Sequence, residues 1–205
     1  MLINPFNPLL VKKIVKPLFF SALLWAIAST SSAQLKLPVT DEFASDMKKV
    51  IREYPHQFNK LQGDVIDEKP QATDYECTLS VAGAESSVIT KYSSSSKPIY
   101  SWQGLMLTTE DFGEAKKKFK SLFTRFNNMA VKMDYGVTFY LKGKYIEPIE
   151  ERNFTSAILS FELPDQITRK MKLEVTMQYE MMEWKVKVLI YERDREDDEP
   201  AEVED

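Results

Sequence analysis

The chain of 205 residues has only one histidine, His56, and one cysteine, Cys77. A disulfide within the chain is therefore impossible, and the usual zinc sites, which need several histidine or cysteine ligands, are excluded. A histidine-based catalytic triad would have to use His56, which follows Pro55 in an expected helix kink. The six glycines are scattered and form no phosphate-binding array. We therefore expect no enzymatic activity, no cofactor and no metal.

The lone cysteine lies in a segment with the alternation of a strand. Tyr75, Cys77, Leu79 and Val81 would share one face of that strand. In an exported protein a single cysteine can be a reactive or intermolecular thiol. It can also be a small buried hydrophobic residue, and we expect Cys77 to be structural and unreactive.

A pair of carboxylates is the one catalytic arrangement that the residue types of this chain still allow. Glu147, Glu150 and Glu151 lie close together in the segment "EPIEERN". Such groups serve as general acid and base when a cleft holds them a few ångströms apart. Acidic clusters in loops are usually solvated, so we assign no catalytic residue here.

The first 33 residues contain no acidic residue and have the three parts of a secretory signal peptide. Three lysines precede an apolar run at residues 18–28, which is short for a membrane-spanning helix. Ser31 and Ala33 are the small residues before an expected cut at Gln34. The alternative is an N-terminal membrane anchor. We expect residues 1–33 to be removed, leaving a periplasmic or secreted protein without stable membrane insertion.

The remaining chain has no net positive charge. Residues 34–193 carry 23 basic and 23 acidic groups, whereas residues 194–205 carry eight carboxylates and one arginine. A neutral body argues against a nucleic-acid partner, because phosphate binding needs a net basic face. We expect residues 34–193 to form a single domain, and residues 194–205 to be a disordered acidic tail.

Two segments place apolar residues at steps of three and four, the spacing of one helix face. In residues 41–63 this stripe runs through Pro55, where we expect a kink or a restart, and Gly63 is the expected stop.

The second helix is expected within residues 110–126, "EDFGEAKKKFKSLFTRF". Thr108 with Asp111 fits the Thr-x-x-acid start signal. Its phenylalanines fall on one stripe, and its lysines fall on the rest of the surface. We expect a core helix with a solvated side, although a helix lying on a membrane surface would show the same pattern.

Three strands are expected after each helix, separated by turn-forming segments. The clearest, "RKMKLEVTMQYE", alternates strictly between apolar and polar residues and predicts a sheet covered on one side. The short segment "EMME" after it suits a hairpin connection. The predicted fold class is α+β, with helices packed on one face of an antiparallel sheet. The two halves, residues 40–108 and 109–192, are candidate repeats of one helix-plus-three-strands unit.

This unit, repeated behind a signal peptide, resembles the tandem architecture of β-lactamase-inhibitor-like and PepSY-like exported proteins. The resemblance covers residues 40–192 and rests on the order of elements and on the pairs Phe43/Phe112 and Trp102/Trp184. It implies a helix layer on one antiparallel sheet, whose open face grips a partner protein. It assigns no functional residue.

The expected function is that of an exported, non-catalytic binding module whose partner is an envelope or secreted protein. We expect its open sheet face to bind through Tyr100, Trp102 and Trp184, because exposed Trp and Tyr dominate interfaces. In this interpretation Tyr100 and Trp102 point to opposite faces of one strand, so that one of them faces water. The alternative is a carrier that holds an apolar small molecule between helices and sheet.

Overall fold

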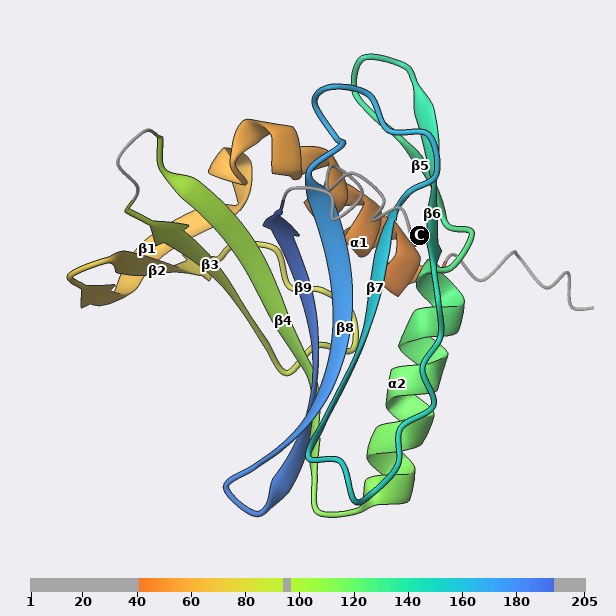
Figure 1. Cartoon of the computed structure of the whole chain (residues 1–205). Helices are drawn as coiled ribbons and strands as arrows, with labels where there is room; N and C mark the ends of the chain where they lie inside the picture. The colour runs from red at the N-terminus through yellow and green to blue at the C-terminus, as the bar shows by residue number, and fades with distance from the viewer. Residues whose placement is uncertain (1–40, 94–96, 194–205) are drawn as a thin grey trace, which may run out of the picture. The chain divides into compact units, whose positions relative to one another are not determined.

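The computed structural model describes residues 41–93 and 97–193 (Figure 1). The predicted signal peptide of residues 1–33 and the predicted acidic tail of residues 194–205 lie outside these ranges. The elements, in chain order, are α1 (Glu42–Glu53), the short 3-10 helices η1 (Tyr54–His56) and η2 (Asn59–Leu61), β1 (Gln62–Lys69), β2 (Ala72–Cys77), β3 (Ser86–Tyr92), β4 (Ile99–Thr109), α2 (Phe112–Phe126), β5 (Ala130–Lys132), β6 (Thr138–Gly143), β7 (Phe154–Phe161), β8 (Met171–Glu180) and β9 (Glu183–Glu192).

Helix α1 ends at Glu53, just before Pro55, which would destabilise a longer helix. Pro55 would remove a hydrogen bond from a longer helix, and the chain instead forms the 3-10 turn η1 at this point. Gln57 and Phe58 then adopt left-handed backbone angles, with φ of 57° at each. The predicted restart at Pro55 is confirmed. The predicted stop at Gly63 is wrong, because strand β1 has already begun at Gln62.

Helix α2 begins one turn later than its sequence signal suggested. Asp111, and not Thr108, is the N-cap residue, and its carboxylate accepts a 2.7 Å hydrogen bond from the Glu114 backbone N–H. Thr108 is still in strand β4, where its hydroxyl donates to Glu85. An aspartate cap is as favourable as a threonine cap, so the strand pairing of residue 108 decides the boundary.

The strands form one nine-stranded sheet in the order β1-β2-β3-β4-β9-β8-β7-β6-β5, and every neighbouring pair is antiparallel. The predicted mixture of helices with an antiparallel sheet is confirmed, and the regular secondary structure is mostly sheet. The predicted count of three strands after each helix is wrong. Four strands follow α1 and five follow α2, because β1, β5 and β6 add to both edges.

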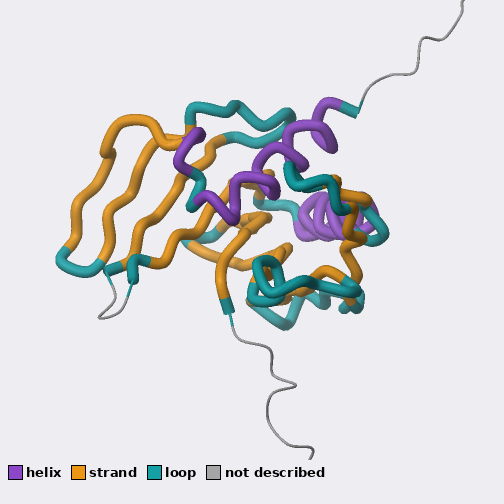
Figure 2. The backbone as a smooth tube through the Cα atoms, turned by 90° about the horizontal axis from the view of Figure 1, so that it is seen from above, coloured by secondary structure: helices purple, strands orange, loops and turns teal. Residues whose placement is uncertain are grey.

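The alternation predicted for strand β8 is confirmed at four of its five predicted inward positions, but Tyr179 is exposed, and Thr176 of the predicted polar face is buried. Met171, Leu173, Val175 and Met177 are fully buried, and the helix stripes lie in the same core cluster. Helix α2 packs against β4, β8 and β9. Phe43 of α1 meets Phe126 of α2 with 5.5 Å between ring centroids, so the two helices also contact each other. Seen from above, α2 is viewed nearly end-on, while α1 runs across the view beside it (Figure 2).

Candidate binding surface

The predicted binding aromatics do not lie on an open face. Trp102 is fully buried and Trp184 is almost so. Trp102 lies opposite Ile89 on one neighbouring strand and opposite Ile190 on the other, and both of these are core residues. Tyr100 is partly buried and packs against the same core. The expectation that Tyr100 and Trp102 face opposite sides is wrong, because residues two apart on a strand share a face.

In the part of the chain that the structure describes, the turn of the β8–β9 hairpin carries the most exposed apolar side chains of any turn. Its two-residue loop is Met181 and Met182, whose side chains are 84% and 79% exposed. The loop is closed by the pair Glu180 and Glu183. Both methionines have positive φ, 54° and 69°. A two-residue hairpin with two left-handed residues normally uses Asn-Gly or a similar pair, so methionine at both positions is conformationally unfavourable.

Aromatic rings support this turn. Tyr179 and Trp184 are the pair just inside the turn, and their ring centroids lie 5.1 Å apart. On its other side Trp184 meets Phe112 at the start of α2 at 5.3 Å. Tyr179 is partly exposed. Phe154, the first residue of β7, is also exposed, but it pairs with Gln178 and therefore faces the side of the sheet opposite to Tyr179. The turn is therefore supported by the packed rings of Tyr179, Trp184 and Phe112. Trp184 is buried, so it supports this surface by packing and does not itself offer an exposed contact.

Carboxylates surround this end of the molecule. Strand β4 ends beside Trp184, so that Glu110 and Asp111 follow there at the start of α2. The Tyr179 N–H donates to the Asn153 carbonyl, which brings the acidic segment of residues 147–151 to the same end. The hairpin tip, the start of α2 and the chain leading into β7 lie together in Figure 1.

Three of the basic groups at this end are engaged by carboxylates. Lys185 and Lys187 lie 3.6 and 3.5 Å from the Glu180 carboxylate, and Lys116 lies 2.7 Å from Glu147. Carboxylates still outnumber basic groups at this end, so the net charge around the methionines is acidic. Sequence reasoning treated "EMME" only as a short connection. The missed signal was the placement of two apolar residues where a two-residue hairpin requires positive φ.

Glu147 of the acidic loop is not suited to act as a general acid. Glu147 is held by Lys116, and the hydrogen bond from that lysine lowers the pKa of the Glu147 carboxyl. A general acid needs a raised pKa, so this shift has the wrong direction for that role. Within residues 41–93 and 97–193, no three His, Cys, Asp or Glu side chains are grouped so that they could hold a metal ion.

Cys77 is partly buried, and its thiol donates to the Leu79 carbonyl at 3.5 Å. Burial raises the pKa of this thiol. Because the thiolate is the reactive form, we expect an aromatic disulfide reagent to label the native protein at least about tenfold more slowly than the urea-unfolded chain near pH 8. Equal rates in the two states would show that Cys77 is an accessible, reactive thiol.

No family model, curated protein or solved structure matches this chain. Among the described residues, no helix combines the length and the apolar character needed to cross a membrane.

Proposed function

We propose that this protein is an exported, non-catalytic binding module that grips an envelope or secreted protein with the β8–β9 end of its sheet. The observation that carries the proposal is the exposed Met181–Met182 turn in an unfavourable backbone conformation. Strained positions that add nothing to packing are concentrated at functional sites. Methionine is also common on adaptable binding surfaces, because its side chain is flexible and polarisable.

The charge around the turn favours a protein over a lipid surface. The net negative charge around the turn would be repelled by the anionic headgroups that attract basic segments. A protein with an apolar pocket and a basic rim would complement both the methionines and the carboxylates. The partner would also meet Tyr179, which enlarges the apolar contact.

The proposal includes an architecture in which both helices cover one face of the sheet and leave the other open. Contacts of α2 with β4, β8 and β9 support this arrangement. It also includes duplication of one unit in residues 40–108 and 109–192. The sheet order supports the duplication, because a helix precedes each run of strands and the last strands of the two runs, β4 and β9, pair at the centre. The likeness to PepSY-like proteins is part of the same proposal.

A carrier of an apolar small molecule receives less support. The side chains of Phe119, Leu122 and Phe126 are buried at the helix–sheet interface, where such a ligand would have to lie. A groove of about 380 Å³ borders Ile66 and Val88, but it is open to solvent and also lined by polar side chains. Apolar ligands are usually enclosed on most of their surface.

The double variant Met181→Asn/Met182→Gly tests the proposal because it separates stability from binding. Asn-Gly suits this turn, so we expect the free energy of unfolding to rise by about 1–2 kcal/mol in urea titrations. The exposed apolar contact is lost, so we expect retention of the partner to fall at least about tenfold. Retention is measured by pull-down from the envelope fraction of the cells that make the protein.

Leu163→Asn is the matched control. Leu163 is 83% exposed and lies in the β7–β8 connection, at the opposite end of the sheet in Figure 1. This variant should retain the partner as the unmodified protein does. Equal retention by the double variant, or a failure of the unmodified protein to retain any protein specifically, would contradict the proposed function.

A further inference from the structure

A small groove lies between helix α1 and the edge hairpin β5–β6, away from the β8–β9 turn. Its volume is about 230 Å³, below the 300–1,000 Å³ usual for drug-sized ligands. Three of its six lining residues are cationic and two carry hydroxyl groups. The lining residues are Ser45, Lys48, Arg52, Ala130, Lys132 and Thr138.

Helix α1 contributes one continuous row of donors. Ser45, Lys48 and Arg52 follow at steps of three and four residues, so they lie on the same side of the helix. The Arg52 Nε–H donates to the Lys48 carbonyl at 3.2 Å, which turns the guanidinium back along the helix toward Lys48. This hydrogen bond uses only Nε. Both terminal amino groups of Arg52 remain for a ligand, in the fork geometry that suits oxyanions.

The hairpin supplies the opposite wall. Lys132 on β5 pairs directly with Thr138 on β6, so an ammonium group and a hydroxyl group stand side by side at the sheet edge. Both residues are exposed. The pairing holds these two donors on a strand framework, opposite the helical row.

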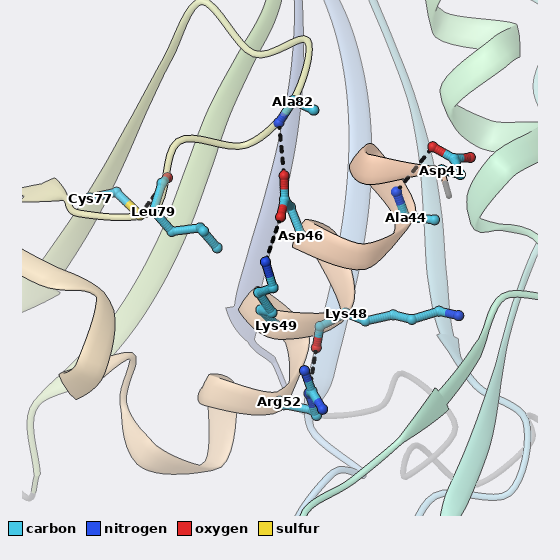
Figure 3. A network of polar contacts seen from close by, with 9 residues as sticks. All are labelled: Asp41, Ala44, Asp46, Lys48, Lys49, Arg52, Cys77, Leu79 and Ala82. Carbon is cyan, nitrogen blue, oxygen red and sulfur yellow. Dashed lines mark hydrogen bonds and ion pairs between the residues drawn. The ribbon is translucent and has the colours of Figure 1, made fainter. Parts of the chain in front are cut away.

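The cations of the groove differ from their neighbour Lys49. Lys49 lies 2.9 Å from the Asp46 carboxylate, which also accepts the Ala82 N–H at 3.2 Å (Figure 3). The hydrogen bond from Lys49 lowers the pKa of Asp46, as expected for a formed ion pair. Figure 3 shows the Lys48 side chain extending away from this pair.

Among residues 41–93 and 97–193, no carboxylate lies within 4.0 Å of the charged groups of Lys48, Arg52 or Lys132. Asp134, two residues after Lys132, instead faces His56 at 3.9 Å. Three uncompensated cations around one groove repel each other and favour an anionic occupant.

We propose that this groove binds a small, doubly charged oxyanion of the phosphate type. Arg52 would bind two of its oxygens, Lys48 and Lys132 would balance its charge, and the Ser45 and Thr138 hydroxyls would donate to the remaining oxygens. The size of the groove suits a phosphate or a small phosphomonoester and is too small for a nucleotide. This site is independent of the Met181–Met182 surface.

The test is titration of the full-length protein with inorganic phosphate by isothermal calorimetry at low ionic strength, with chloride at matched ionic strength as the reference. We expect saturable one-site binding. Arg52→Gln and Lys132→Gln should each weaken it about tenfold or more, since each removes a charged hydrogen-bond donor. Lys117→Gln changes the net charge equally on the exposed side of α2 and should leave the Kd unchanged. Circular dichroism checks that each variant is folded.

The chain itself offers a second source of oxyanions, because residues 194–205 hold eight carboxylates. Strand β9 ends near α1, where burial and the charge of Glu192 raise the pKa of Tyr54. The titration is therefore repeated on a chain that ends at Arg193. Binding that emerges only in the shortened chain, and that Arg52→Gln removes, supports an oxyanion site for which the tail competes. Absence of binding in both chains, or equal Kd values for Arg52→Gln and Lys117→Gln, overturns the proposal.

Discussion

Replacing Phe119 by alanine should lower the free energy of unfolding by about 3–5 kcal/mol. Phe119 is fully buried on α2, and its ring lies 6.0 Å from that of Tyr145. The helix packs this side against β4, β8 and β9. Deleting the ring removes apolar burial and leaves a cavity that the sheet cannot collapse to fill. Urea denaturation followed by circular dichroism measures the loss.

Lys117→Ala is the control for helix propensity and charge on the same helix. Lys117 is exposed, so its replacement should change the free energy of unfolding by less than about 0.5 kcal/mol. A loss below about 1 kcal/mol for Phe119→Ala would show that the stripe is not a core face. The alternative of a helix lying on a membrane surface would then gain support.

The sequence predicted the central part of the fold because burial there imposes a clear period. The stripe of α2 recurs every three or four residues, and β8 alternates over its length. Strand β9 begins with the same alternation at Trp184 and Val186. These elements lie where helices and sheet meet, so nearly every inward position must be apolar.

The sheet edges could not be predicted in this way. Strand β1 is largely exposed and reads "QGDVIDEK", so no apolar face marks it as a strand. Strand β5 has only three residues. Strand β1 forms by pairing with β2, and β5 forms by pairing with β6. Such pairing depends on the tertiary structure and cannot be read from the local sequence pattern.

The binding surface was even less accessible to sequence reasoning. Tyr100, Trp102 and Trp184 were chosen as aromatic residues, but aromatic side chains on a central strand are at least as useful in the core. The hairpin methionines depend on backbone angles that the residue types do not favour. The oxyanion groove combines α1 with an edge hairpin about 80 residues later, so only tertiary structure brings its donors together.

Trp102→Ala should cost about 3–5 kcal/mol of unfolding free energy, which identifies Trp102 as a core residue and not a surface anchor. Trp102 is fully buried on β4, the strand that lies between β3 and β9. Gly104 makes room for it, because a Cβ at that position would approach the indole Cη2 to 2.6 Å. Alanine at position 102 would leave a large cavity at the centre of the sheet.

Trp102→Phe separates the ring's packing from its polar atom. The indole N–H of Trp102 is buried and makes no hydrogen bond of normal geometry. It lies near the Cys77 sulfur, where it acts against the rise in the pKa of the thiol that burial causes. Phenylalanine removes this buried, unsatisfied donor while keeping most of the ring, so we expect it to cost less than half as much as alanine. A loss below about 1 kcal/mol for Trp102→Ala, together with reduced retention of the partner, would instead place Trp102 on the binding surface. Full retention by a destabilised but folded Trp102→Ala protein would leave the Met181–Met182 turn as the principal contact.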